Sequence, residues 1–266
     1  MLTANCMQLI ETKYSVKERT IIKVHSMPTT VFASSKGGVG KSTAAVLFAT
    51  ELAEAGATVT IIDGDPNKPV SDWAGQGEIP KSLRVIGDVT EKTIIDVIEA
   101  EEKVSTHVIV DLEGSASMMV AYAISRADLV ILPVQGSQLD AREAAKSVVL
   151  VRQQEKAFGK TIPHRILYTR TNSAIRPRTL KDVQAQIKDA GFPRLDVEIY
   201  ERDAFRAIFS FGGTLYTLNP KQVSSLDAAI ANARSFAHEV LSQLVELYGT
   251  EKSEAVAENN RVLEGV

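Results

Sequence analysis

Nine consecutive residues, Ser35-Lys36-Gly37-Gly38-Val39-Gly40-Lys41-Ser42-Thr43, have the composition of a site that binds phosphate. An apolar segment, 30–33, precedes them, and a helical pattern begins at Ser42. A strand that leads through a glycine-rich turn to a helix N-terminus directs backbone N–H groups and the positive end of the helix dipole at one point. The run therefore predicts a phosphate cradle, in which Lys41 reaches the β- and γ-phosphates and Ser42 holds Mg²⁺. The alternative is a glycine-rich turn with solvated lysines.

The strict P-loop pattern, G-x-x-x-x-G-K-[ST], is not met, because Ser35 stands at its first glycine. The extra lysine, Lys36, and the glycine pair after it resemble the deviant Walker A motif, K-G-G-x-G-K-[ST], of the ParA/MinD family of ATPases. This resemblance implies that residues 36–43 bind ATP. It also implies that Lys36 crosses a dimer interface to the phosphates of the partner's nucleotide, where a cation offsets the charge that develops during phosphoryl transfer.

Two aspartates follow the next buried strand, 58–62, in the sequence Asp63-Gly64-Asp65-Pro66-Asn67. Carboxylates at i and i+2 at the end of a strand both point toward the same edge of the sheet. The segment resembles the switch region of the family, which implies that Asp63 holds a water in the outer shell of Mg²⁺ and that Asp65 orients the attacking water. The alternative is an ordinary turn rich in Asp, Gly and Pro.

A third carboxylate, Asp111, ends the apolar segment 107–110 and resembles a Walker B aspartate that reaches Mg²⁺ through water. The family usually continues Asp-x-Pro, whereas this chain has Asp111-Leu112-Glu113. Glu113 has two interpretations, an additional base or a cap for a helix that begins near Ser115, and capping is favoured. Lys36, Lys41 and Asp65 are thus the candidate catalytic residues, and Ser42, Asp63 and Asp111 are the candidate metal ligands.

From Val31 onward, β-branched segments alternate with helical patterns, which is typical of βαβ units and a parallel sheet. The predicted fold is α/β: a single P-loop domain over residues 29–248, with a doubly wound, mostly parallel sheet flanked by helices. Residues 1–28 are expected to be a weakly ordered extension, and Met27 is a candidate for the true start. Residues 249–266 are expected to be a flexible acidic tail, because they lack a basic amphipathic pattern.

Composition excludes several classes of protein. The chain has 266 residues, of which 44% are hydrophobic and 24% charged, and it contains no apolar run long enough to span a bilayer. Its start lacks the pattern of a secretory signal, and its single cysteine, Cys6, cannot form an internal disulfide. A cytoplasmic location is expected, with no membrane partner. An iron–sulfur reductase would need more cysteines.

Positive charge is concentrated in one part of a chain whose net charge is −3. Residues 152–181 contain eight basic residues and one acidic residue, a net charge of +7, so the rest of the chain carries a net charge of −10. A basic zone on an acidic body suits contact with a phosphate backbone, although a solvated surface is equally consistent with it. The family resemblance implies a non-specific DNA surface in this region, with the candidate residues Arg176, Arg178, Lys181 and Lys188.

The resemblance as a whole implies a ParA-type ATPase. Within that family the chain most resembles the VirC-type proteins that assist DNA transfer. Its ATP hydrolysis would be weak and stimulated by a partner. It would form a homodimer with ATP, bind DNA in that state and associate with the nucleoid. With a ParB-like partner it would segregate or position plasmid or chromosomal DNA. The alternatives are an accessory ATPase in DNA transfer and a positioning ATPase for a protein cargo.

Overall fold

A parallel sheet forms the centre of the computed structural model, which describes residues 28–114, 117–135, 138–173 and 177–264. For residues 138–141 and 250–264 it describes the backbone alone. Within these residues the sheet has seven strands: β1 (Thr29–Phe32), β2 (Val59–Gly64), β3 (Leu83–Ile86), β4 (His107–Leu112), β5 (Leu129–Val134), β6 (His164–Thr171) and β7 (Ile199–Tyr200). Residues 1–27 of the predicted extension, and Arg176, lie outside the described residues.

The strands lie in the order β3-β2-β4-β1-β5-β6-β7, and every pairing is parallel. The chain leaves β1 toward one edge, returns through β4, and then continues from β5 toward the other edge. The strand order thus reverses around β1, and ligands of doubly wound folds bind at the carboxyl ends of the strands at such a point. The predicted doubly wound α/β fold is confirmed.

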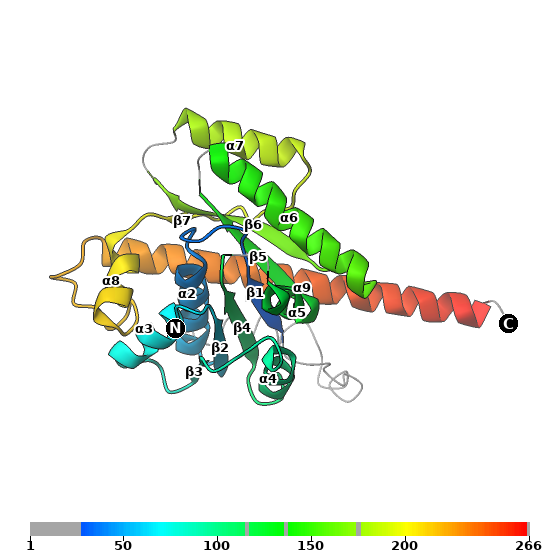
Figure 1. Ribbon diagram of the computed structural model, residues 1–266, viewed down its shortest axis with the longest axis horizontal. Helices are drawn as coiled ribbons and strands as arrows, with labels where there is room; N and C mark the ends of the chain where they lie inside the picture. Colours follow the sequence, from blue (N-terminus) through cyan, green and yellow to red (C-terminus); the bar gives the residue numbers. More distant parts are fainter. Residues whose placement is uncertain (1–27, 115–116, 136–137, 174–176, 265–266) are drawn as a thin grey trace.

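Eight helices in the described part of the chain cover both faces of the sheet (Figure 1). The helices α2 (Lys41–Glu54), α3 (Pro69–Gln76), α8 (Asp203–Phe211) and α9 (Leu226–Glu264) pack on one face. The helices α4 (Ile94–Glu101), α5 (Met118–Arg126), α6 (Gln138–Phe158) and α7 (Arg178–Asp189) pack on the other. Successive residues of a strand point to opposite faces of the sheet, so Phe32 packs in one hydrophobic core and Val31 in the other. Because both faces are covered, the strands must be apolar along their whole length.

Helix α9 differs from the prediction at its C-terminal end. The sequence predicts a loose tail after residue 248, whereas α9 continues as a helix to Glu264. Residues 250–264 consist mainly of Glu, Ala, Lys, Val, Asn and Arg and contain neither proline nor glycine. Many of them are good helix formers, so a helix nucleated by the packed part of α9 continues through them. The division into domains stays a prediction.

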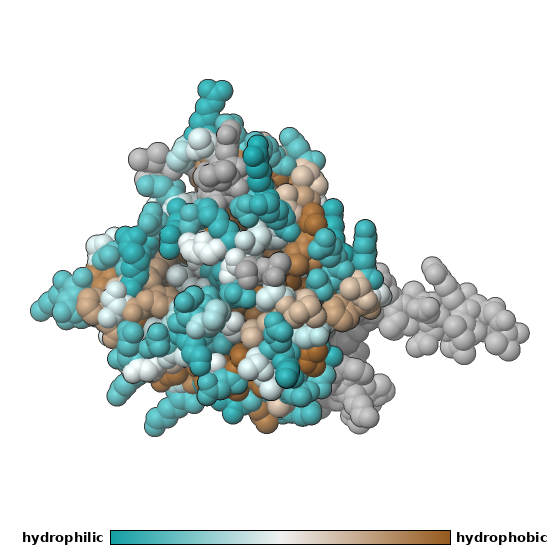
Figure 2. Space-filling view, in the orientation of Figure 1, coloured by the Kyte–Doolittle hydropathy of each residue, from teal (hydrophilic) through white to brown (hydrophobic). Residues whose placement is uncertain are grey.

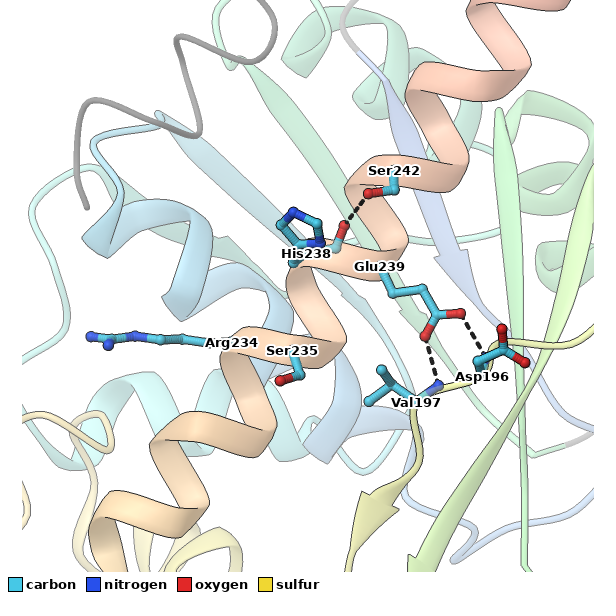
Figure 3. Close-up of a pocket in the computed structure, with 7 residues that line it drawn as sticks. All are labelled: Asp196, Val197, Arg234, Ser235, His238, Glu239 and Ser242. Atoms are coloured by element: carbon cyan, nitrogen blue, oxygen red, sulfur yellow. Dashed lines mark hydrogen bonds between the residues drawn. The ribbon is translucent and has the colours of Figure 1, made fainter.

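The edge strand β7 is covered by side chains of α9 in place of another strand. The Asn232 amide donates to the Glu198 carbonyl at 2.8 Å and accepts from the Tyr200 N–H at 3.0 Å. Glu239 accepts from the N–H groups of Asp196 and Val197 at 2.6 and 2.7 Å (Figure 3). These contacts satisfy backbone groups that an exposed edge would offer to another chain.

Helices α3 and α8 approach each other through glycine backbone. A Cβ on Gly77 would lie 2.6 Å from the Gly213 nitrogen, and a Cβ on Gly212 would lie 2.6 Å from the Gly77 nitrogen. Gly212 also has a φ of +73°, which favours glycine. The buried Trp73 indole donates to the Gly213 carbonyl at 2.8 Å. The only tryptophan therefore packs in the core.

A buried carboxylate joins α2 to α9. Both oxygens of Glu51 accept from the Tyr216 hydroxyl, at 2.8 and 2.9 Å, and the Arg234 guanidinium lies 3.7 Å from Glu51. Burial raises the pKa of Glu51 to about 7, against the opposing effects of Tyr216 and Arg234. Desolvation of the charged form thus outweighs both partners.

Stability should consequently depend on pH through Glu51. Its pKa is near 4.5 in the unfolded chain and about 7 in the folded protein, so its contribution to stability is complete below pH 4.5 and lost as pH rises through 7. Glu51→Gln removes this loss. The gain in free energy of unfolding of the variant over the wild type should be about 1–3 kcal/mol larger at pH 8 than at pH 5. Urea titrations at both pH values measure it, with the exposed Glu54→Gln as control. An equal effect of Glu51→Gln at both pH values would contradict the prediction.

Candidate nucleotide-binding site

The loop between β1 and α2 has the backbone geometry of an anion cradle. Gly38 and Gly40 have φ values of +75° and +93°, and Gly40 is the N-cap of α2. Side chains rarely tolerate these angles, so the two glycines are required by conformation. A Cβ on Gly40 would meet Thr169 only at 3.6 Å, which is an ordinary contact.

Two side chains from neighbouring strands orient the peptide units of this loop. The Gln135 amide donates to the Gly38 carbonyl at 3.0 Å, and the Thr169 hydroxyl donates to the Val39 carbonyl at 2.6 Å. In a trans peptide the N–H points opposite to the C=O. The N–H groups of Val39 and Gly40 therefore face away from Gln135 and Thr169, as an anion-binding nest needs. Sequence reasoning did not find these two supporting roles.

The P-loop also packs closely against the segment that follows β4. A Cβ on Gly114 would overlap the backbone of Lys36 and Gly37. This close approach requires glycine at position 114 and brings the end of β4 against the predicted phosphate site. Spacing alone gave no signal for this contact, because the two segments lie more than 70 residues apart in sequence.

Lys41 is buried among carboxylates. Lys41 is the first residue of α2 and is 5% exposed. Burial lowers the pKa of its ammonium group. The charges of Asp111, Asp65 and Glu113 oppose that shift. The structure thus brings together a lysine from the P-loop, an aspartate after β2 and two acids at the end of β4. A buried cation with several nearby acids can bind a phosphate chain once a metal ion or the ligand balances the charge.

Asp111 lacks hydrogen-bond partners although it is fully buried. Burial raises its pKa to about 7; the Ser42 hydroxyl and the Lys41 ammonium oppose this shift, and Asp63 and Asp65 add to it. Ser42 lies close enough to act on the pKa, but its hydroxyl does not form a hydrogen bond of normal geometry, and both Asp111 oxygens are unpartnered among the described residues. An orphaned carboxylate beside a hydroxyl fits a hard cation such as Mg²⁺.

Asp63 lies next to Asp111 on the neighbouring strand, where the two are register partners. Its carboxylate is already occupied: one oxygen accepts from the Ser71 N–H and hydroxyl at 2.7 and 2.9 Å, and the other from the Asp65 N–H at 3.4 Å. Burial nevertheless raises the pKa of Asp63. Asp63 therefore ties the predicted switch segment to helix α3 through Ser71, which sequence reasoning missed. Its role at a metal stays a prediction.

Asp65 is more accessible and forms a turn with Asn67, whose N–H and amide donate to it at 2.9 and 3.0 Å. Glu113 does not cap helix α5, so that prediction was wrong. The helix begins at Met118, and Ser117 is its N-cap, accepting from the Val120 N–H. The predicted start was three residues too early, and Glu113 instead lies near Lys41.

A pocket of about 550 Å³ lies elsewhere, between α9 and the segment before β7. It is lined by Asp196, Val197, Arg234, Ser235, His238, Glu239 and Ser242. Figure 3 shows Arg234 extending away from Asp196 and Glu239, while Glu239 is engaged with backbone N–H groups. The charged groups of this pocket do not converge, so the P-loop remains the candidate site. No group of three or more metal-ligating side chains occurs among the described residues.

Known proteins match nearly the whole folded part of the chain. The family model described as VirC1 protein matches residues 27–248. The chain is 42% identical to Protein ParA of Rhizobium radiobacter over 220 residues, which cover 83% of this chain and 99% of that protein. It is 26% identical to virC1 of Rhizobium rhizogenes over 200 residues, covering 72% and 84%.

The chain belongs to the VirC1 family. Solved structures support the same fold: a ParA family ATPase from Chlorobium tepidum has a TM-score of 0.62 at 20% identity, covering 81% of this chain and 99% of that one. A Cyanothece McdA variant in complex with ATP has a TM-score of 0.67 at 15% identity, covering 81% and 96%. The resemblance to ParA/MinD-type P-loop ATPases is confirmed for this VirC1-family chain. The roles of its individual site residues stay predictions.

No helix within the described ranges has both the length and the apolar character that a bilayer crossing demands.

Asp111→Asn should stabilise the nucleotide-free VirC1-family protein and weaken its response to ligand. Removing an unpartnered buried charge beside Asp63 should raise the free energy of unfolding by about 1–3 kcal/mol. The same change removes the carboxylate that fits a cation, so the extra stabilisation by ATP and Mg²⁺ should shrink. Thermal melts with and without MgATP measure both effects.

Asp63→Asn is the matched comparison on the adjacent strand. Its carboxylate accepts on both oxygens, from Ser71 on one and from the Asp65 N–H on the other, whereas an amide has only one acceptor oxygen. This variant should therefore not become more stable. A higher melting temperature for Asp63→Asn, or a lower one for Asp111→Asn without nucleotide, would contradict this interpretation of the two carboxylates.

Proposed function

We propose that this protein is a slow ATP hydrolase, stimulated by a partner, that dimerises with ATP and positions DNA. The observation that carries the proposal is the grouping of Lys41, Asp65 and the unpartnered Asp111 beside a loop whose N–H groups form a cradle. This arrangement supports binding of a triphosphate together with a divalent cation.

In this proposal the backbone of residues 37–43 binds the phosphate chain and Lys41 neutralises the β- and γ-phosphates. Ser42 and Asp111 would hold Mg²⁺ directly or through water, and the ion would supply additional neutralisation of charge on the phosphates. Asp65 would orient the attacking water. Its carboxylate is held at the end of β2 by the turn with Asn67, which favours one orientation.

Lys36 would serve the second subunit. It is exposed at the tip of the loop, whereas Lys41 is buried at its base, so the two lysines are suited to different nucleotides. Two subunits that face each other across their P-loops would each donate Lys36 to the other's phosphates. A cation that arrives only on association would make hydrolysis depend on the dimer, as an arginine finger does.

The surface for DNA would include α6 as well as α7. On α7, Arg178, Lys181 and Lys188 are exposed, but so are Asp182 and Asp189. Residues 142–160 are more uniformly basic: Arg142, Lys146, Arg152, Lys156 and Lys160 are exposed, and the two glutamates among them, Glu143 and Glu155, are half-buried. Figure 2 shows hydrophilic side chains projecting over this part of the molecule, where Figure 1 places α6 and α7. Such a surface supports contact with phosphates of any sequence.

The cargo would be a plasmid or other replicon bound by a ParB-like partner, and ATP-bound dimers would associate with the nucleoid. The 42% identity to Protein ParA favours this over other cargoes. A VirC-like accessory role in DNA transfer is the second candidate, favoured by the match of the family model to residues 27–248. A protein cargo is supported more weakly, by 30% identity over 172 residues to a carboxysome distribution protein of Gloeobacter kilaueensis.

Lys36→Ala should abolish the ATP-dependent dimer while nucleotide affinity changes by less than about threefold, because Lys41 and the cradle remain. The comparison is made in an Asp65→Ala background, which should prevent hydrolysis and accumulate the dimer. Sedimentation with ATP or ADP measures association, and a fluorescent ATP analogue measures affinity. Lys41→Ala is the contrasting variant and should lose nucleotide binding. A Lys36→Ala protein that still dimerises with ATP would refute the role of Lys36.

Reversing the charge of Arg178 and Lys181, or of Lys156 and Lys160, should weaken ATP-dependent DNA binding at least tenfold and reduce its dependence on salt. The matched control is Lys81→Glu with Lys92→Glu, two exposed lysines on the β3 side of the sheet. Mobility shifts at several salt concentrations measure the change. Binding that falls equally in the control would show a general charge effect and no specific surface.

A further inference from the structure

Ser35, which replaces the first glycine of the strict P-loop pattern, is held by helix α6. Its hydroxyl donates to the Glu143 carboxylate at 2.8 Å and to the Glu143 carbonyl at 3.0 Å. Its N–H donates to the Ser147 hydroxyl at 3.0 Å, and that hydroxyl lies 3.2 Å from the Ser35 hydroxyl. The residue immediately before Lys36 is thus fixed to two consecutive turns of one helix, more than 100 positions later in the chain.

These contacts anchor the loop on the N-terminal side of Lys36, and the backbone of Lys36 is held as well. The Lys36 N–H donates to the buried Ser34 hydroxyl at 3.2 Å. Beyond Lys36, Gly37 and Gly38 are exposed, and added Cβ atoms would meet nothing within 4 Å. The backbone from which the Lys36 side chain extends is therefore held at Ser34 and Ser35, and the exposed glycine pair follows it.

Glu143 is well suited to hold this anchor. One carboxylate oxygen binds Ser35, and the other accepts from the Lys146 ammonium at 2.7 Å. Lys146 and Ser35, in that order, hold the pKa of Glu143 below its ordinary value, and the charge of Lys36 adds to this. The carboxylate is thus an ionised acceptor at neutral pH, and charge-assisted hydrogen bonds of this kind are stronger than neutral ones.

We propose that Glu143 is a positioning residue for Lys36: through Ser35 it fixes the root of this lysine and so favours the orientation in which its ammonium group reaches a partner's nucleotide. The proposal rests on the proposed role of Lys36. Glu143 does not itself touch the phosphates. Its loss would leave the cradle intact and require Ser35 and Lys36 to be ordered during association, which slows the step that Lys36 serves.

Two single variants and their combination test the proposal. Glu143→Ala removes the acceptor, and Ser35→Gly restores the strict P-loop glycine while removing the hydroxyl. Each should lower ATP turnover about tenfold, with affinity for a fluorescent ATP analogue unchanged within twofold. Because both changes break the same link, the double variant should be no slower than either single one. Glu143→Gln, which retains an acceptor oxygen, and Ser35→Thr, which retains a hydroxyl, should recover most of the turnover.

Gln154→Ala, elsewhere on α6, is the control and should match the wild type, and thermal melts confirm that every variant is folded. Turnover of Glu143→Ala equal to that of the wild type, a loss of nucleotide affinity that matches the loss of turnover, or strictly additive effects in the double variant would each overturn the proposal. Absence of turnover in the wild-type protein, with or without DNA, would instead refute the hydrolase function. The two failures are therefore distinguishable.

Discussion

Two aspartates lie side by side on neighbouring parallel strands, and the rest of the site depends on how the fold accommodates this pair. Asp63 and Asp111 are register partners on β2 and β4, and both are almost completely buried. Parallel strands lie only about 5 Å apart, so two carboxylates here repel each other and lose their hydration. Their surroundings differ: Asp63 accepts two hydrogen bonds from Ser71, whereas Asp111 has no hydrogen-bond partner in the part of the chain that the structure describes. Asp63 thus has a structural contact with helix α3, and Asp111 remains available to a cation.

The same constraint explains why the P-loop is held from several directions. Its lysine, Lys41, is drawn into a buried acidic environment, so the loop backbone must be fixed precisely around it. Gln135 and Thr169 bind carbonyl oxygens from the β5 and β6 side, and Gly114 packs against the loop from the β4 side. A cradle preorganised in this way does not have to reorder its dipoles when a phosphate binds. The buried charges of Lys41 and Asp111 reduce the stability of the nucleotide-free protein.

The sequence was most informative where physical requirements are local. Continuous apolar strands and the glycines of the P-loop follow from burial and from φ angles, and both lie as predicted. It was least informative about contacts between distant segments. Ser71 beneath Asp63, Gly114 beside the P-loop and Thr169 behind Val39 become visible only when the strands are placed in order. The start of α5 was missed because a good N-cap, Ser117, competes with an equally plausible serine two residues earlier.

Helix α6 connects two properties that would otherwise belong to separate parts of the molecule. Its N-terminal half binds the root of the P-loop through Glu143 and Ser147, and the exposed side of the same helix carries the basic residues from Arg142 to Lys156. Lys146 belongs to both sets, since it pairs with Glu143 and is exposed. A helix packed on the sheet moves as a rigid body, so a shift of the loop on association would also move the basic surface. Nucleotide state and phosphate-backbone contact would then be linked through one element, without a separate domain to carry the signal.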